Sequence, residues 1–245
     1  MITDILTVLW KEGIELIHMR GSARSTFTIM IFPILILGVI FPIQFGRKWA
    51  ESPVSLIAWA WMPLIITISV IADSIAGEKE RHTLETLLAS RLPDRAILFG
   101  KLLASVLYAL ATTALLILIG LVTVNIRYAG EGIIWFNGVY FLVGSSLGVL
   151  GTTFISTVGI LVSLKAQTVR QAAQTMSFGI IIVAVLPGLL IGILPVHLRK
   201  WIFSSLDNLD GALALIAVIG VFLVINALLL AVTLSRFKRN RLMTE

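Results

Sequence analysis

The 245-residue sequence contains no cysteine and few charged residues. Without cysteine the chain has no disulfide framework, no thiolate metal ligand and no thiol nucleophile. Charged residues make up 13% of the sequence, against about 25% in soluble domains. Hydrophobic residues make up 58%. Much of this apolar surface must face something other than water, which indicates a membrane protein.

Acidic and basic residues are almost absent from six long apolar segments. A helix needs about 20 mostly apolar residues to cross the hydrocarbon core of a bilayer. We expect the fourth helix to begin near Gly138, after an interfacial approach at its start. The sequence therefore predicts an all-α polytopic membrane protein, a single domain over residues 1–245, with transmembrane helices at 25–46, 52–72, 98–126, 137–164, 171–195 and 211–235.

The first two dozen residues have a different pattern, with apolar positions recurring at helical spacing. Lys11, Glu12, Glu15 and Arg20 lie mostly elsewhere on the helical wheel. This pattern predicts an amphipathic helix over residues 1–22 that lies on the membrane surface. The alternative is a short soluble helix packed on the bundle.

The distribution of basic residues predicts the orientation of the chain. Six spans place both termini on one side of the membrane. Of the 19 lysines and arginines, the opposite side holds only Arg47, Lys48, Arg127, Arg199 and Lys200. Because basic loops stay in the cytoplasm, we expect both termini to be cytoplasmic and the chain to lie in the plasma (inner) membrane. The net charge of +6 is then a topology signal with some affinity for anionic lipid, and not a sign of nucleic-acid binding.

Several kinds of chemistry have little support. The predicted spans lack the buried carboxylate that a proton-coupled carrier usually needs. Gly144–Gly148 matches the G-x-S-x-G pattern of serine hydrolases, but no histidine lies in a span to act as base, so close helix packing explains the glycines better. The three histidines are far apart and predict no metal site. The sequence has no phosphate-binding loop, so we expect no enzymatic activity and no cofactor on this chain.

The least apolar internal stretch is DSIAGEKERHTLETLLASRLPDRA, residues 73–96, between the second and third predicted spans. Gly77 permits a turn out of the second span, and Pro93 breaks the helix before the third. Arg81 and Glu85 have the i, i+4 spacing of a surface ion pair. We expect a short cytoplasmic helix within residues 77–91, tied at both ends to transmembrane helices. The alternative is a solvated loop whose charges only maintain topology.

This stretch resembles the signature segment of the ABC-transporter type 2 permease family. Members show an acidic or polar residue at the end of the second span, a G-E-[KR]-E-x-x-T-L-E-x-L-L segment, a turn with proline and then a G-K pair. The matching elements here are Asp73, Gly77-Glu78-Lys79-Glu80, Thr83-Leu84-Glu85, Leu87-Leu88, Pro93 and Gly100-Lys101. Lys11-Glu12 in the opening helix and Pro33 in the first span are similar to the same family.

The resemblance implies half of an ATP-driven exporter. Two permease copies, a homodimer in the simplest case, would pair with two separate ATPase subunits that bind ATP and Mg²⁺, and alternating access would move a substrate out of the cytoplasm. Segment 77–91 would be the coupling helix that docks on the ATPase. Its polar contacts would come from Glu78, Lys79, Glu80, Arg81 and Glu85, while Thr83, Leu84 and Leu87 would fill the groove. The alternatives are an ATPase-coupled scaffold or sensor that transports nothing, and an ATPase-independent carrier.

Two polar stripes are candidates for the substrate path. Along the fourth predicted span, Ser145, Thr152 and Ser156 share one face, which Ser163 extends. At the start of the fifth, Gln171, Gln174 and Thr175 form a second stripe. Helix packing and hydrogen bonding explain small and polar residues equally well, and for the fourth span we favour packing. The sequence does not specify the substrate.

Overall fold

The computed structural model describes residues 1–18, 34–52, 54–130, 132–193, 195–198 and 211–237. In these ranges the regular secondary structure is helical and no strand is present, as the sequence predicts. The elements are α1 (Ile2–His18), the π-helix η1 (Ile34–Ile40), α3 (Phe41–Phe45), α4 (Arg47–Glu51), α5 (Val54–Glu80), α6 (Leu84–Ala89), α7 (Asp94–Arg127), α8 (Gly138–Lys165), α9 (Val169–Ile193) and α11 (Gly211–Arg236).

Three of the described helices are long and apolar enough to cross a membrane: Asp94–Arg127, Gly138–Lys165 and Ile216–Arg236. They correspond to the third, fourth and sixth predicted spans. The first predicted span, 25–46, lies partly outside the described residues and continues as η1 and α3. The second and fifth correspond to α5 and α9, which have 27 and 25 residues. Six membrane crossings stay a prediction.

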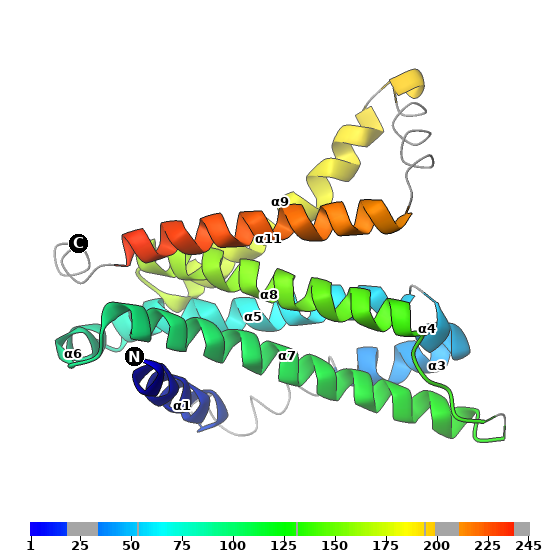
Figure 1. Ribbon diagram of the computed structural model, residues 1–245, viewed down its shortest axis with the longest axis horizontal. Helices are drawn as coiled ribbons and strands as arrows, with labels where there is room; N and C mark the ends of the chain where they lie inside the picture. The colour runs from blue at the N-terminus through cyan, green and yellow to red at the C-terminus, as the bar shows by residue number, and fades with distance from the viewer. Residues whose placement is uncertain (19–33, 53, 131, 194, 199–210, 238–245) are drawn as a thin grey trace.

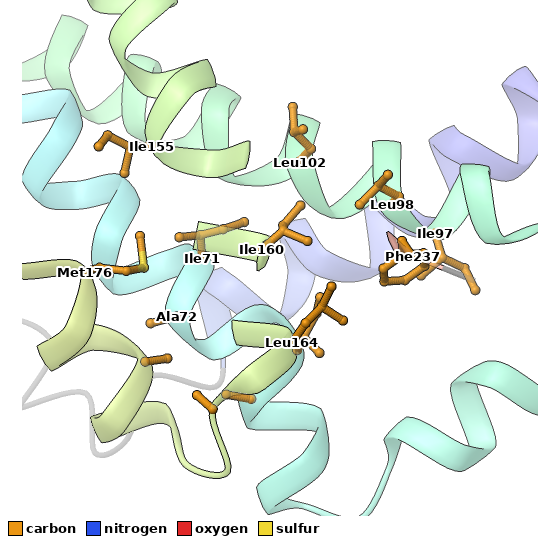
Figure 2. Close-up of a cluster of buried hydrophobic side chains, with 14 of the residues drawn as sticks. Ile71, Ala72, Ile97, Leu98, Leu102, Ile155, Ile160, Leu164, Met176 and Phe237 are labelled. Carbon is orange, nitrogen blue, oxygen red and sulfur yellow. The ribbon is translucent and has the colours of Figure 1, made fainter. Parts of the chain in front are cut away.

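Helices α5, α7 and α8 form the centre of the molecule. Figure 1 shows α1 beside α7, α11 along the outer side of α8, and α6 at the opposite end of the bundle from α3 and α4. Helix α5 makes its most extensive contact with α8. The main core lies between these helices and includes Ile71 of α5, Ile97 and Leu98 of α7, and Ile160 of α8 (Figure 2).

Glycine allows α5 and α8 to approach closely. A Cβ atom on Gly159 would lie 2.3 Å from Cγ2 of Ile71 and 2.7 Å from Cε of Met176, so no larger residue fits without displacing a neighbour. Gly151 is in a similar position, because a Cβ atom there would lie 3.0 Å from Cδ2 of Leu64. Gly151 and Gly159 of α8 therefore serve close helix packing, while a packing role for the Gly144–Gly148 pattern stays a prediction.

The connection between α5 and α7 differs in detail from the prediction. Gly77 is not the turn, because α5 continues through it to Glu80. The chain turns instead at residues 81–83, where His82 has a positive φ of 57°. The predicted helix over 77–91 is thus two pieces, the last turn of α5 and the short helix α6, before α7 begins at Asp94 directly after Pro93.

Candidate functional site

Five charged side chains from three helices meet at the end of the bundle that carries α6. We call Lys11, Glu12, Glu15, Glu78 and Lys101 the ion cluster. The side chain of Lys101 is only 2% exposed, and its Nζ lies 2.6 Å from Oε1 of Glu12 and 3.4 Å from Oε1 of Glu78. It also donates a hydrogen bond of 2.7 Å to the carbonyl oxygen of Ser74. One buried ammonium group therefore holds α1, α5 and α7 together.

Lys11 closes the ion cluster from the side of α1. Its Nζ lies 2.8 Å from Oε1 of Glu78 and 3.2 Å from Oε1 of Glu15. Burial opposes ionisation of Lys11, but the hydrogen bond to Glu78 and the nearby carboxylates outweigh it and raise the pKa of Lys11 above its usual value of 10.5. Lys11 thus stands as a cation between carboxylates.

Glu78 is ionised although its side chain is buried. Burial alone would raise the pKa of Glu78, but the charge of Lys101 and hydrogen bonds from Lys11 and Thr83 lower it to about 2. A buried carboxylate is stable as an anion only with this kind of compensation. The ion cluster is therefore a charged junction. Its net contribution to the stability of the fold depends on how well its members are paired.

The ion cluster requires α1 to lie very close to α7, and Gly100 makes this possible. A Cβ atom at Gly100 would lie 2.5 Å from Cβ of Val8 and 3.3 Å from the carbonyl oxygen of Ile5. Val8 is itself only 2% exposed. The G-K pair of the sequence thus has two linked roles, in which Gly100 admits α1 and the next residue, Lys101, binds its acidic side chain Glu12.

The residues after Glu78 bind other parts of the bundle. Lys79 donates hydrogen bonds from Nζ to the carbonyl oxygens of Leu164 and Ala166, at the C-terminal end of α8 where a cation is favoured. The backbone N–H of Val169, the first residue of α9, donates to Oε2 of Glu80 at 3.0 Å. Glu78, Lys79 and Glu80 therefore connect the end of α5 to four other helices in succession.

A second ion pair stiffens the last turns of α5. Nη2 of Arg81 lies 2.8 Å and 2.9 Å from the two carboxylate oxygens of Asp73, two helical turns earlier. Gly77 lies between them, and a Cβ atom there would come within 2.2 Å of Oδ1 of Asp73. Glycine at this position leaves room for the ion pair. Arg81 thus pairs with Asp73, and not with Glu85 as its spacing in the sequence suggested.

Helix α6 has an inner and an outer face. Leu84 and Leu87 are half-buried and pack against the main core, so they face the bundle in this structure. The hydroxyl of Thr83 donates to the carboxylate of Glu78. Glu85 and Thr86 are exposed, as are Arg81 and His82 in the turn before them. Of the residues proposed for coupling, Glu85 is therefore the one on α6 that faces outward.

The two candidate stripes for the substrate path lie in different surroundings. Ser145 donates to the carbonyl oxygen of its own helix at Phe141. Thr152 and Ser156 are fully buried, and Oγ of Ser156 is 2.8 Å from Oγ of Ser105 on α7. Within this chain, those two residues therefore contact neighbouring helices. The α9 stripe is different, because its residues Gln171, Gln174 and Thr175 are exposed.

A small cavity of about 30 Å³ lies beside the ion cluster, between α1, α5 and α7. This volume holds one or two water molecules and no larger ligand. The carboxylates of Glu12, Glu15 and Glu78 come within 4.8 Å of one another, a spacing that suits a metal ion. Lys11 and Lys101 already neutralise them at hydrogen-bonding distance, so the ion cluster is better described as a structural junction than as a metal centre.

Sequence reasoning singled out Glu78 and its neighbours but missed the partners that bind them. Glu12, Glu15 and Lys101 were noted as charged positions without a role in one site. Their sequence separations from Glu78 are long, and no periodicity connects them. The one signal in the sequence was Lys101, a cation near the start of the otherwise apolar third predicted span, 98–126.

Comparison with known proteins agrees with these features. Residues 51–208 match the family described as "ABC-2 family transporter protein". The chain is also similar to "ABC transporter permease protein NatB" of Bacillus subtilis (strain 168), with 27% identity over 187 residues. That alignment covers 69% of this chain and 45% of the Bacillus protein, so the chain spans less than half the length of this relative. With the family match extending over more than half of its sequence, the chain belongs to the ABC-2 transporter family.

Proposed function

We propose that this chain is the membrane-spanning subunit of an ATP-driven exporter, and that the turn at residues 81–83 together with α6 docks on a separate ATPase subunit. Membership of the ABC-2 transporter family and the similarity to a permease protein support this proposal. The observation that carries the proposal further is the fixed attachment of α6. The outer face of α6 is exposed, while the residues just before this helix are bonded to α1, α7, α8 and α9.

This attachment gives a physical route for coupling. A displacement of α6 would move α5, because the short turn and the hydrogen bond from Thr83 to Glu78 connect them. Helices α1 and α7 would move with α5, because Lys11 and Lys101 bind Glu78. Lys79 and Glu80 connect α5 in the same way to the adjoining ends of α8 and α9. Closure of the ATPase pair would therefore rock several helices together, the kind of rigid-body motion that alternating access needs. ATP and Mg²⁺ would bind the partner ATPase.

Helix α1 would lie along the membrane surface. Its outward positions are apolar and recur every four residues, with Ile2, Leu6, Trp10 and Ile14 exposed by 76%, 56%, 72% and 40%. Its acidic side chain Glu12 faces the opposite way and is bound by Lys101. We infer that the apolar side enters the interfacial region of the bilayer, while the ion cluster replaces the water that usually solvates the polar side of such a helix.

The substrate path is proposed to follow α9. Its exposed polar side chains, Gln171, Gln174 and Thr175, have room to meet a substrate or a second copy of the chain, whereas Thr152 and Ser156 are enclosed by neighbouring helices. A homodimer with α9 from each copy near the shared axis would place both polar stripes along one route. The substrate class stays open in this proposal.

The test is a purification of the tagged chain from its native membrane in mild detergent, with partners identified by mass spectrometry. We expect a stoichiometric ATPase subunit that carries a phosphate-binding loop. Glu85→Lys, on the outer face of α6, should lose that subunit, because it reverses a charge at the proposed contact. Glu51→Lys, exposed on α4 at the other end of the bundle, is the matched control and should keep it (Figure 1). Equal recovery of the ATPase with both variants would contradict the docking surface.

The rival function is an ATPase-coupled scaffold or sensor that carries no substrate. Both functions predict the same complex, so they are separated by ATP hydrolysis of the purified complex in lipid vesicles against a panel of candidate substrates. Stimulation by one compound, together with its accumulation inside inverted vesicles, supports export. ATP hydrolysis that no compound stimulates, in vesicles that accumulate none of them, supports the rival. Solute flux through the chain without any ATPase would instead indicate an independent carrier.

A further inference from the structure

The segment between α7 and α8, residues 132–137, is non-helical and has two distinct sides. Ile134 and Phe136 are 4% and 8% exposed, whereas Ile133 and Trp135 are 89% and 65% exposed. The buried side packs into a second core cluster that includes Trp49, and the rings of Trp49 and Phe136 have centroids 5.2 Å apart. Both the buried side and the exposed side of this segment therefore consist of apolar residues.

Asn125 of α7 holds the backbone of this segment in place. Its Nδ2 donates to the carbonyl oxygen of Ile134 at 2.9 Å, and its Oδ1 accepts from the backbone N–H of Ile134 at 2.8 Å. The side-chain amide thus satisfies both backbone groups of one residue, as an adjacent strand would. This pairing places Ile134 level with Asn125, in the last turns of α7.

The depth of Ile134 in the bilayer can be inferred from the exposed side chains along α7. The exposed side of α7 is apolar over most of its length, with Leu107, Leu118, Val122 and Ile126 exposed by 51%, 56%, 56% and 72%. At 1.5 Å per residue, the distance from Leu107 to Ile126 is about 29 Å, close to the hydrocarbon thickness of about 30 Å. Ile126 therefore lies near one boundary of the hydrocarbon core, and segment 132–137 lies at the same depth.

We propose that segment 132–137 is a membrane-interface anchor, in which Ile133 and Trp135 contact lipid where the acyl chains meet the headgroups. Tryptophan is enriched at this depth because its ring is apolar and its N–H is polar. Non-helical backbone is tolerated there only when its polar groups are satisfied, and Asn125 does this for Ile134. The anchor fixes the end of α7 that is remote from the ion cluster. It depends on the membrane location of the chain and not on its coupling to an ATPase.

The absence of cysteine makes the proposal directly testable. A nitroxide label is attached to Trp135→Cys in the full chain, in phosphatidylcholine–phosphatidylglycerol vesicles, and its collisions with oxygen and with a water-soluble nickel chelate are measured. Leu118→Cys on the apolar side of α7 and Gly130→Cys in the turn are the references. A Cβ at Gly130 meets nothing within 4 Å, so the label fits there.

We expect the label at residue 135 to give a depth between those at 118 and 130, with more oxygen and less nickel contact than at 130. Nickel contact equal to that at 130 would overturn the proposal, because the segment would then face water. Shielding from both reagents would also overturn it, since a second copy or another protein would then cover the residue. Adding Asn125→Leu should bring the label at 135 toward the values at 130.

A second measurement avoids the label. Phosphatidylcholine brominated near the headgroup quenches tryptophan at shallow depth. Trp135→Phe should remove part of the quenched emission, whereas Trp49→Phe should not, because Trp49 is 2% exposed. An unchanged quenched fraction in Trp135→Phe would contradict lipid contact.

Discussion

Lys101 provides the sharpest test of the ion cluster, because one side chain holds three helices. Lys101→Met keeps the length and apolar stem of the residue and removes its charge. The change abolishes contacts of 2.6 Å with Glu12, 3.4 Å with Glu78 and 2.7 Å with the Ser74 carbonyl oxygen. Glu78 keeps Lys11 at 2.8 Å, but the nearest cation left to Glu12 is Lys11 at 3.7 Å.

Breaking a buried ion pair by removing one partner costs about 3–5 kcal/mol, because the other charge stays buried without compensation. For a chain of this size that corresponds to a fall in melting temperature of roughly 6–20 °C. The assay is thermal unfolding of the purified protein in detergent, followed by intrinsic fluorescence. Lys165→Met, at the exposed end of α8, is the matched control and should change the free energy of unfolding by less than about 0.5 kcal/mol.

A double variant separates the ion cluster from a general packing effect. Glu12→Gln removes the charge that Lys101→Met leaves with only the more distant Lys11, at 3.7 Å, so the double variant should be more stable than the sum of the two single changes predicts. Additive losses would show that Glu12 and Lys101 do not interact. A melting temperature of Lys101→Met equal to that of the wild type would refute the reasoning as a whole.

Three further outcomes follow from the same region. Gly100→Val should destabilise the chain by about 1–3 kcal/mol and make α1 easier to cleave in limited proteolysis, because the new side chain collides with α1. The pKa of Glu78, about 2 against its usual 4.5, contributes about 3 kcal/mol of stability above pH 4.5, which is lost as the pH falls toward 2. Glu78→Gln should therefore reduce the pH dependence of the free energy of unfolding in this range. Glu80→Ala should cost about 1 kcal/mol by removing the acceptor at the first residue of α9, while Glu85→Ala should be neutral in thermal unfolding.

Composition and periodicity were sufficient to predict an all-helical chain with long apolar helices. The start of α8 near Gly138 was predicted from the excess length of the fourth apolar segment. In the structure Asn137 caps the helix there, because its Oδ1 accepts from the backbone N–H of Val139. The face shared by Thr152 and Ser156 also followed from their spacing. What that face contacts did not, because Ser105 on α7 belongs to a different helix whose rotation the sequence leaves open.

The ion cluster could not be predicted for a related reason. Its contacts join residues that are 67 and 89 positions apart, and they depend on how closely α1 approaches α7. That approach is set by the missing side chain of Gly100, which a sequence pattern does not distinguish from a glycine in a turn. The turn after α5 was placed at Gly77 for the same reason. In the structure this glycine makes room for the Asp73–Arg81 ion pair, and the turn follows four residues later.

The central claim is that the outer face of α6 docks on a separate ATPase, and site-specific cross-linking tests it most directly. Thr86 is exposed on that face, and the chain has no native cysteine, so Thr86→Cys can carry a single photoactivatable cross-linker in native membranes. The account predicts a cross-linked product that contains this chain and a subunit with a phosphate-binding loop, while the same reagent on Glu51→Cys gives none. Cross-linking of that ATPase from residue 51 but not from residue 86 would contradict the claim.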